Sequence, residues 1–393
     1  MLSVSALVRG TVTSGDVLRY GRSSRAPAPL LHYSADKRPV VVWNVTQRCN
    51  LHCVHCYASA RDREYPGELT TDEGLSLLED LAGFGVPVVL FSGGEPLLRP
   101  DLLALMRRAR DLGMRAVLST NGTLLGHEEA IALRDAGVSY VGVSLDGVER
   151  THDLVRGLRG AFRASLSGIQ ACRAVGLRVG LRVTVHRWNS RELPDLMRLM
   201  TDEHIDRMCV YHLAYAGRGA GIKSYDLAPE ETRGLVEGIF DWVAGWPEGD
   251  PRELLTVDNH ADGPFLYLWL KDRVPERAAE AARLLTWNGG NQSGVAIACV
   301  DPQGNVHPDQ FSWHQDLGNV RERPFSAIWT DVSNPLLAFY RDRRGRIGGR
   351  CRDCRFFDWC NGNLRVRAER ASGALDAEDP ACYLNGAEIA AGP

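Results

Sequence analysis

Three cysteines near residue 50 are the residues whose types and spacing point most directly to chemistry. Cys49, Cys53 and Cys56 stand at Cys-x3-Cys-x2-Cys spacing in the run RCNLHCVHCYA. Three thiolates are one short of the four that usually hold an iron–sulfur cluster, so one iron of a cubane cluster would stay open for another ligand. Zinc is the alternative, because His52 or His55 in the same run could supply its fourth ligand.

Four more cysteines form a second group near the end of the chain. Cys351, Cys354 and Cys360 follow Cys-x2-Cys-x5-Cys spacing, and Cys382 lies in the run DPACYL. Four thiols are enough for a closed site. Thiolate softness suits both a [4Fe–4S] cluster and structural zinc, so the residue types alone leave both open.

The elements that must position the first group are strands and helices in alternation. Apolar, β-branched runs predict strands at 39–45, 87–93, 115–121, 140–146, 178–185 and 207–213. Helical patterns lie between them, and a capping box at Thr70 and Glu73 opens one of these helices. Six strand–helix units in series predict a parallel sheet that curls into a partial (β/α) barrel.

Glycine-rich or polar turns follow the first four predicted strands. After the cysteine loop come the turns Gly93-Gly94-Glu95-Pro96, Ser119-Thr120-Asn121-Gly122 and Ser144-Leu145-Asp146-Gly147. Active sites of α/β barrels lie at the carboxyl ends of the strands, where these turns would meet. One such turn is a weak signal, because plain turn chemistry explains it. Three such turns that converge on the cysteine loop, which follows the first strand, predict a ligand site.

Composition limits the class of protein. The chain has 393 residues, of which 44% are hydrophobic and 24% charged, as in ordinary globular proteins. A net charge of -3 offers little attraction to a nucleic acid backbone. The first residues, MLSVSALVRGTVTSG, lack the apolar core of a signal peptide, and no run reaches the ~20 apolar residues of a membrane span. We expect a cytoplasmic protein that binds neither nucleic acid nor membrane.

The same patterns suggest a domain organisation. The expected parts are an N-terminal extension (1–36), a core barrel (37–245), a linker with substrate-facing loops (246–297) and a C-terminal domain (298–393). A Pro/Ala stretch at 23–30 reads as a connector. The glycine-rich segment 214–225 predicts a mobile loop over the barrel mouth, and 295–314 predicts a β-hairpin.

The first cysteine group, with Tyr57 after it and Gly93-Gly94-Glu95 on the next strand end, resembles the radical SAM superfamily over about residues 37–215. The resemblance implies a partial TIM-like barrel and a [4Fe–4S] cluster on three thiolates, with S-adenosylmethionine on the fourth iron. Reduction of the cluster would then yield a 5'-deoxyadenosyl radical that takes a hydrogen atom from the substrate. It also implies a low-potential electron donor such as flavodoxin or ferredoxin.

The resemblance further implies which residues would contact the S-adenosylmethionine. Gly93, Gly94 and Glu95 would receive its methionine amino end, and Tyr57 is a further candidate for cofactor contact. Arg182 could hold the carboxylate as a guanidinium fork, or form an ordinary ion pair of the barrel. The candidates for the ribose or carboxylate are Ser119, Asn121, Ser144 and Asp146.

The second cysteine group resembles the second auxiliary-cluster site of the SPASM-type extension found in many radical SAM enzymes. That extension usually carries three further cysteines and another cluster. Here Leu364 and Asp309 stand at two of the expected cysteine positions. The resemblance therefore implies one auxiliary [4Fe–4S] cluster, and two clusters in all.

Several stretches resemble radical SAM enzymes that trim tetrapyrrole side chains. These stretches include TVDNHADG, TWNGGNQSG and GNVHPDQFSWH. The nearest group is the 12,18-didecarboxysiroheme deacetylases of haem biosynthesis, favoured by the early run GTVTSGDVLRYGR. The implied reaction removes two acetate arms and gives iron-coproporphyrin III. Propionate removal for haem d1, a peptide maturase, and a haem- or cluster-carrying binding protein without turnover remain the alternatives.

Such a substrate carries several carboxylates and an iron, so its site should offer guanidinium, imidazole and aromatic groups. The candidates for substrate contact are Arg218, Asp258, Asn259 and Trp313. The candidates for catalysis are His260, His307 and Asp309. A hydrogen-bonded structural role is the alternative for each histidine. Arg365 and Arg367 are expected to face solvent or to pair with nearby acids.

Overall fold

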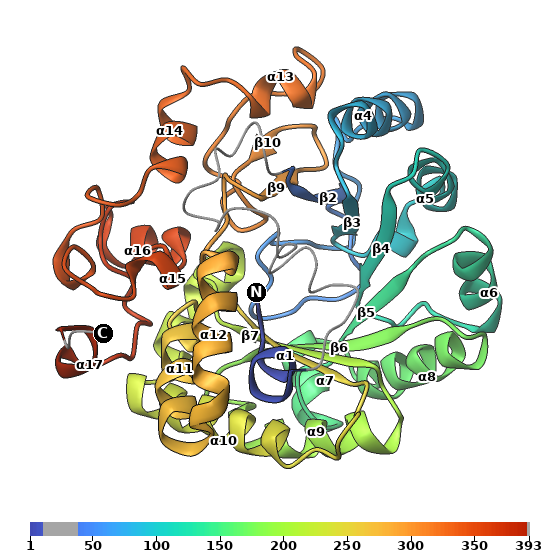
Figure 1. Cartoon of the computed structure of the whole chain (residues 1–393). Coiled ribbons are helices and arrows are strands. Elements are labelled where there is room, and N and C mark those ends of the chain that lie inside the picture. The colour runs from blue at the N-terminus through green and yellow to red at the C-terminus, as the bar shows by residue number, and fades with distance from the viewer. Residues whose placement is uncertain (11–37, 391–393) are drawn as a thin grey trace.

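The computed structural model describes residues 1–10 and 38–390, so the predicted connector at 23–30 lies outside the described residues. One curved sheet organises the chain (Figure 1). Its strands follow the order β1-β8-β7-β6-β5-β4-β3-β2-β9-β10. Within the described residues, no helix is both long and apolar enough to cross a membrane.

The six central strands confirm the six predicted from the sequence. They are β2 (Val40–Thr46), β3 (Val88–Gly93), β4 (Arg115–Thr120), β5 (Tyr140–Ser144), β6 (Val179–Val185) and β7 (Arg207–His212). Each pairs in parallel with its neighbour in the sequence. All six carboxyl ends therefore lie on one edge of the sheet, as the partial barrel requires.

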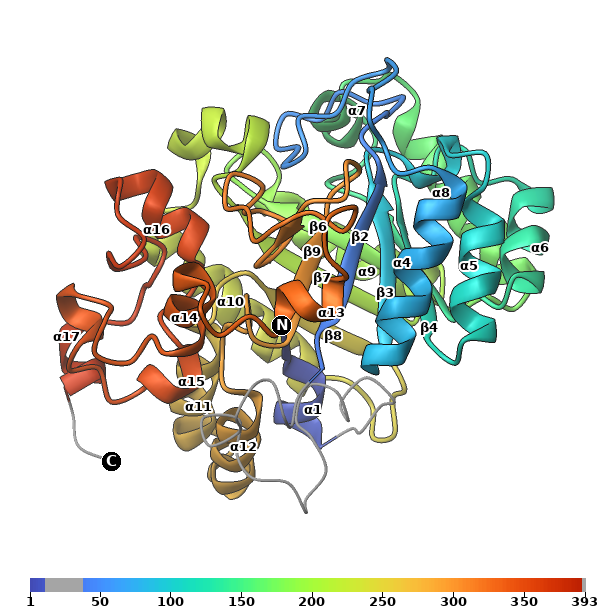
Figure 2. The same ribbon diagram turned by 90° about the horizontal axis from the view of Figure 1, so that it is seen from above.

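Helices cover the outer face of this sheet (Figures 1 and 2). They are α4 (Thr71–Phe84), α5 (Leu102–Asp111), α6 (His127–Asp135), α8 (Ala161–Ala174) and α9 (Leu193–Asp202). Helix α7 (Arg150–Arg156) and the short 3-10 turns η2 (Pro96–Leu98) and η3 (Ser190–Glu192) follow the carboxyl ends of strands. The predicted capping box is present at α4: the Thr70 hydroxyl accepts from the Glu73 backbone N–H, and the Glu73 carboxylate accepts from the Thr70 N–H.

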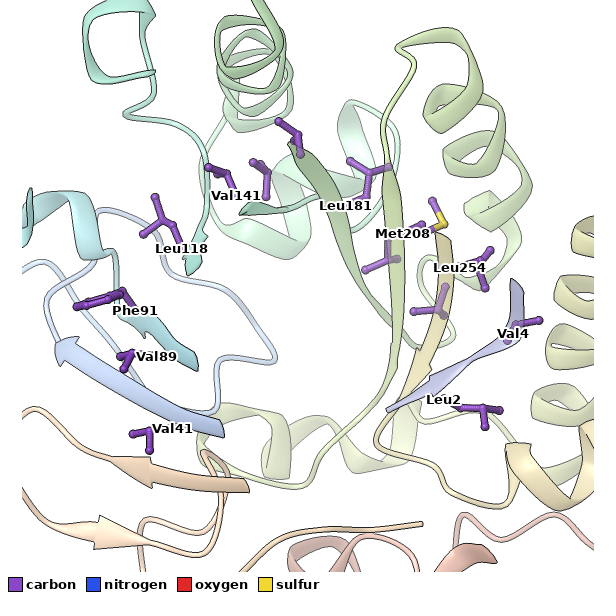
Figure 3. Packing of buried hydrophobic residues seen from close by; sticks show 14 of the residues in the cluster. Leu2, Val4, Val41, Val89, Phe91, Leu118, Val141, Leu181, Met208 and Leu254 are labelled. Atoms are coloured by element: carbon purple, nitrogen blue, oxygen red, sulfur yellow. The ribbon is translucent and has the colours of Figure 1, made fainter. Parts of the chain in front are cut away.

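The main core lies between the strands and these helices. Val41, Val89, Leu118, Val141 and Leu181 come from five adjacent strands and are wholly buried on the outer face of the sheet (Figure 3). Burying each such side chain contributes about 1.5–3 kcal/mol. Because side chains alternate along a strand, the residues between them face the barrel interior.

Further strands extend both edges of the sheet. β8 (Glu253–Val257) runs parallel to β7, and β1 (Leu2–Ser3) pairs antiparallel with β8 ahead of helix α1 (Val4–Arg9). At the other edge lie β9 (Ile297–Val300), parallel to β2, and β10 (Val306–His307), which confirms the predicted hairpin. Residues 246–297, expected as a linker, thus contain β8 and also α11 (Asp262–Arg273) and α12 (Pro275–Asn288).

The glycine-rich segment expected as a mobile loop is instead the 3-10 helix η4 (Gly217–Tyr225), followed by α10 (Pro229–Ala244). Its start is bonded to the first cysteine loop, since the Arg218 N–H donates to the Cys56 carbonyl at 2.9 Å. Gly217 has φ 53, and a Cβ there would lie 2.2 Å from the Tyr57 carbonyl oxygen. Only glycine allows so close an approach.

Short helices of the C-terminal region lie beside the barrel and carry the second cysteine group (Figure 1). They are α13 (Phe325–Trp329), α14 (Pro335–Arg341), η5 (Gly349–Cys351), α15 (Phe357–Cys360), α16 (Arg365–Ser372) and α17 (Gly386–Ala390). Arg365 and Arg367 are wholly buried here, so the expectation that they face solvent is wrong. The alternative expectation, pairing with a nearby acid, holds for Arg367, which pairs with Asp379 at 2.8 Å.

Candidate functional site

An open cavity lies at the carboxyl ends of the central strands. It gathers residues that lie far apart in the sequence and that were predicted to act together. Among its lining residues are Cys49, Cys53, Cys56, Tyr57, Gly93, Gly94, Ser119, Asn121, Ser144, Arg182, Arg218 and Asp258. The barrel therefore brings the three thiols, most of the expected cofactor contacts and two expected substrate contacts into one space.

Helix α7 holds one side of the cysteine loop (Figure 2). The backbone N–H groups of His52 and Val54 donate to the carbonyls of Arg156 and Val155, at 3.1 and 2.9 Å. These bonds flank Cys53 in the chain, so its backbone is fixed from both sides. Satisfying buried backbone groups in this way is what keeps an irregular loop in one conformation.

Arg218 holds the other side of the loop. Its Nε donates to the Cys53 carbonyl at 2.7 Å, and its Nη1 donates to the Ala60 carbonyl at 2.8 Å. The remaining nitrogen, Nη2, has no hydrogen-bond partner among the described residues. Arg218 was expected to contact substrate, and the structure places it on the cavity wall as a brace of the cysteine loop.

Arg156 was not among the residues predicted from the sequence. Its guanidinium lies 2.5 Å from the Asp146 carboxylate and donates to the Cys53 sulfur at 3.5 Å. Burial alone would raise the pKa of Asp146, but Arg156 and His55 hold it below the ordinary value. Nothing in the sequence marks Arg156, because its role arises only where α7 crosses the cysteine loop.

Asp146 itself lies behind the cavity wall. Its Oδ1 accepts from the Thr184 N–H at 2.7 Å, its Oδ2 lies 3.4 Å from His55 Nε2, and the side chain is fully buried. Its own backbone N–H donates to His152 Nδ1 at 3.0 Å. Asp146 was expected to contact the cofactor, and the structure places it beneath the cysteine loop as a charged anchor for Arg156.

Glu95 is also fully buried behind the wall. Its carboxylate accepts from the Thr120 hydroxyl at 2.7 Å and from the Asn121 backbone N–H at 2.8 Å, which ties the end of β3 to the end of β4. Gly93 and Gly94 form the exposed part of this turn. A Cβ on Gly94 would lie 2.1 Å from the Arg48 carbonyl, so the wall is built from bare backbone.

The sulfur atoms of the first group lie in a setting suited to metal-bound thiolates. Cys49 Sγ accepts from the Leu51 N–H at 3.4 Å and lies 3.9 Å from Asn121 Nδ2. Burial, with the two neighbouring thiols adding to it, raises the pKa of Cys49 to about 12. Such a thiol ionises when a metal binds it, because coordination deprotonates the sulfur outright.

The described residues contain no group of three or more His, Cys, Asp or Glu side chains placed around one metal ion. In a cubane cluster each thiolate binds a different iron, so its ligands are spread around the cluster and do not meet at one point. The donor set and the open position beside bare glycine backbone both fit a three-thiolate cluster with a further ligand.

The far wall of the cavity is made by β6, β7 and the end of β8. The Arg182 guanidinium lies 4.9 Å from the centre of the Tyr211 ring. Asp258 follows β8 with φ 68, and burial raises its pKa to about 7. Tyr211 was not singled out in the sequence, although it lies in a predicted strand.

Two of the predicted catalytic residues lie in the β9–β10 hairpin and outside the cavity lining. His307 is buried, with Nδ1 at 2.9 Å from the Gln315 carbonyl and Nε2 at 3.2 Å from Asp301. Asp309 accepts from the Ser312 hydroxyl and the Phe311 N–H, both at 2.9 Å. His307 has the bonds expected of a structural group that holds the hairpin, whereas Asp309 Oδ2 has no hydrogen-bond partner among the described residues.

The other three predicted residues also lie outside the lining. The Asn259 amide donates to the Ala381 carbonyl at 2.9 Å, and the His260 backbone N–H donates to Asn363 at 2.7 Å. Trp313 meets Tyr57 edge to face at 6.3 Å. Asn259 and His260 therefore join the end of β8 to the C-terminal region, and Trp313 packs behind the cysteine loop.

The second cysteine group also comes together in space. Burial raises the pKa of Cys351 to about 11, and the nearby thiols of Cys382 and Cys354 contribute to the shift. The pKa of Cys360 is raised by burial and by the other three thiols. Arg350 donates to the carbonyl of Cys382, which fixes the fourth cysteine beside the other three.

Comparisons with known proteins agree with this geometry. Residues 43–200 match the model of the radical SAM superfamily. The chain is 53% identical over 394 residues to Fe-coproporphyrin III synthase of Methanosarcina barkeri, with 99% of both chains covered. It is 42% identical over 368 residues to pre-heme d1 synthase of Dinoroseobacter shibae, with 92% of this chain and 90% of that one covered.

Solved structures share the fold. SuiB of Streptococcus suis bound to S-adenosylmethionine superposes with a TM-score of 0.67 at 18% identity, over 88% of this chain and 78% of that one. The enzyme anSMEcpe with bound AdoMet gives a TM-score of 0.66 at 18% identity, over 88% and 94%. The chain therefore belongs to the radical SAM superfamily, and with it uses S-adenosylmethionine and a [4Fe–4S] cluster.

Proposed function

We propose that this protein acts in haem biosynthesis and removes the two acetate arms of 12,18-didecarboxysiroheme to give iron-coproporphyrin III. The observation that carries the proposal is the 53% identity to Fe-coproporphyrin III synthase along 99% of both chains. The cavity supports it, because it adjoins the three thiols and has the guanidinium groups of Arg182 and Arg218 on its walls. A haem precursor is thus the proposed substrate.

The chain's own residues would divide the work of holding the cofactors. Cys49, Cys53 and Cys56 would hold the radical-generating cluster, and the bare backbone at Gly93 and Gly94 would receive the methionine amino group. When bound, the pair supplies a 5'-deoxyadenosyl radical that takes a hydrogen atom from the substrate. Further contacts would come from Tyr57, Ser119, Asn121, Ser144 and Arg182, all of which line the cavity.

The change on the substrate balances simply. For each arm, the reduced ring loses one hydrogen and one carboxymethyl group and gains one C=C bond, which equals the loss of acetic acid. The hydrogen atom leaves with the deoxyadenosyl carbon, so the departing carboxymethyl group needs one electron and one proton. We assign the electron to a low-potential donor protein such as flavodoxin or ferredoxin, with a cluster on Cys351, Cys354, Cys360 and Cys382 as the relay.

The test is an anaerobic incubation of the reconstituted protein with 12,18-didecarboxysiroheme, S-adenosylmethionine and dithionite, followed by product mass. We expect 5'-deoxyadenosine and a tetrapyrrole lighter by two acetate arms. A protein that forms no 5'-deoxyadenosine would be a binding protein without turnover. If 5'-deoxyadenosine forms with a peptide while the tetrapyrrole leaves the absorbance unchanged, the protein is a peptide maturase.

Removal of propionate arms is the second candidate, because the chain is 42% identical to pre-heme d1 synthase across 92% of its length. The two reactions separate by mass, since a propionate arm carries one CH2 more than an acetate arm. A product that has lost the heavier arms would transfer the assignment to the haem d1 route. The cavity walls do not distinguish the two, because both arms end in a carboxylate.

A further inference from the structure

We propose that Tyr211 and Asp258 form a subsite that binds a carboxylate side chain of the substrate through the Tyr211 hydroxyl and the Asp258 carboxyl group. The inference rests on the proposed function and adds the residues that recognise the substrate's acid arms. Neither residue is needed to hold the cysteine loop. Both line the cavity at the ends of β7 and β8.

Each residue presents an unpartnered polar atom in a buried position. The Tyr211 hydroxyl and Asp258 Oδ2 have no hydrogen-bond partner among the described residues. Each side chain is only 8% exposed. Buried polar groups are almost always hydrogen-bonded, because an unmade bond leaves the cost of desolvation uncompensated. Two such groups side by side on a cavity wall indicate a ligand that completes them.

The backbone at Asp258 is held in the conformation that presents this carboxyl group. Its φ of 68 lies in the left-handed region, which is costly for a residue with a Cβ. The Arg367 guanidinium donates to the Asp258 carbonyl at 2.8 Å and to the Leu213 carbonyl at 3.1 Å. One buried arginine thus locks both strand ends that carry the subsite, as expected for a preorganised binding site.

The charges around Asp258 decide what it can bind. The N-terminal amino group, Arg367 and His212 favour its ionised form, while Asp309 disfavours it. Burial outweighs the favourable charges and raises the pKa of Asp258 to about 7. Near neutral pH the group can therefore keep its proton and donate it, as the Tyr211 hydroxyl does, to a carboxylate.

The subsite lies next to the residues proposed for the cofactor, with the Tyr211 ring 4.9 Å from the Arg182 guanidinium. In the sheet, β8 stands five strands from β3, whose end carries the glycines proposed for the methionine amino group. Arg182 on β6 and Ser144 on β5 lie between them and are the groups proposed for the methionine carboxylate. The pair on β7 and β8 is thus left for the other anion that enters the cavity, an acid arm of the tetrapyrrole.

The test is an absorbance titration of the anaerobic, cluster-loaded protein with 12,18-didecarboxysiroheme between pH 6 and pH 8.5. Because binding needs one proton on Asp258, the wild-type Kd should rise above about pH 7 and approach tenfold per pH unit. Asp258→Asn keeps a donor but cannot ionise, so its Kd should not change with pH. Tyr211→Phe should weaken binding roughly tenfold and keep the pH dependence.

Controls separate this inference from the proposed function. Tyr225→Phe, on the exposed η4 helix, should bind as the wild type does. S-adenosylmethionine affinity, measured separately, should be unchanged in all variants. If Asp258→Asn keeps the wild-type pH profile, or loses S-adenosylmethionine instead of the tetrapyrrole, the inference is overturned. If the wild-type protein binds no tetrapyrrole at any pH, the proposed function is wrong, and a tetrapyrrole carboxylate is then also excluded as the ligand of the subsite.

Discussion

Cys49, Cys53 and Cys56 line an open cavity, whereas Cys351, Cys354, Cys360 and Cys382 gather among short helices beside the barrel. The first group has three thiols and an adjoining space for a ligand. The second has four thiols and does not contribute to the cavity lining. A site that must bind a reactant needs an open position, while one that only stores or passes an electron can be closed on all sides.

Arginines anchor both groups, and buried histidines add to the anchoring of the first. The first depends on buried histidines and on the Asp146–Arg156 pair beneath the loop. The second depends on arginines, since Arg350 binds the Cys382 backbone and Arg367 pairs with Asp379 three residues earlier. An unfolded histidine gains a proton below about pH 6.5, whereas burial lowers the pKa of His152 to about 4, and arginines keep their charge throughout. Acid should therefore affect the first group before the second.

The largest expected effect comes from removing thiols. Changing Cys49, Cys53 and Cys56 together to alanine should abolish 5'-deoxyadenosine formation and lower the iron content from about eight to about four per chain. Cys382→Ala should retain the cluster of the first group and the cleavage of S-adenosylmethionine without substrate. Iron analysis and chromatography of the nucleoside measure both. Zinc in place of iron at either group would contradict this assignment.

The next largest effect tests the close contact between the start of η4 and the cysteine loop. Gly217→Ala places a Cβ 2.2 Å from the Tyr57 carbonyl at a left-handed φ, so we expect loss of most S-adenosylmethionine cleavage and of about half the iron. Gly221→Ala, four residues on, meets nothing within 4 Å and should behave as the wild type does. Equal behaviour of the two variants would show that η4 does not shape the first site.

A third variant addresses the anchor of the second group. Arg367→Ala leaves Asp379 buried without its partner and should lower the free energy of unfolding by about 3–5 kcal/mol. Arg344→Ala removes the exposed pair with Asp358 and should cost no more than about 1 kcal/mol. Anaerobic urea unfolding measures both. If the two variants lose similar amounts of the free energy of unfolding, Arg367 does not anchor the second group.

The smallest expected effect is in pH. Burial lowers the pKa of His152 to about 4. Below pH 6.5 the unfolded chain protonates this histidine, whereas the folded protein keeps it neutral until about pH 4. The contribution of His152 to the free energy of unfolding is therefore fully present above pH 6.5 and is lost as pH falls toward 4. The full loss is about 3 kcal/mol.

Thermal unfolding of the anaerobic protein between pH 7 and pH 5 measures this dependence. His152→Gln should show a smaller fall of the midpoint than the wild type. His127→Gln, on the exposed start of α6, is the matched control and should show the full fall. If the unfolding midpoint of His152→Gln falls with pH as steeply as that of the wild type, another group sets the acid sensitivity of the first site.

Much of the barrel could be predicted because its strands carry continuous apolar, β-branched runs, and its strand ends carry glycine or small polar residues. The strand at Glu253–Val257 could not be predicted as readily, since five residues without flanking glycine give a weak pattern. That strand ends at Asp258, and without it the relation of Asp258 to the cavity is invisible. The predicted hairpin was found because Gly304 and Asn305 mark its turn.

The site shows a similar limit. Cysteine spacing identifies the loop, because ligand spacing is a local property of the sequence. Arg156 and Tyr211 act through tertiary contacts, and which face of β7 points inward depends on pairing that the sequence does not state. The sequence marks Glu95 and Asp146 as polar residues at strand ends, but it does not show which way their side chains point. They turn away from the cavity and bind backbone N–H groups of neighbouring strand ends.

Arg367 has a consequence for how the molecule opens. Its side chain leaves α16, but its bonds end on the backbone after β7 and β8 and on Asp379. Any local unfolding of the C-terminal helices must withdraw this guanidinium and leave two buried carbonyl oxygens unsatisfied in the cavity wall. We therefore expect the two regions to open together in hydrogen exchange, with backbone amides of both protected to a similar free energy although they lie more than a hundred residues apart.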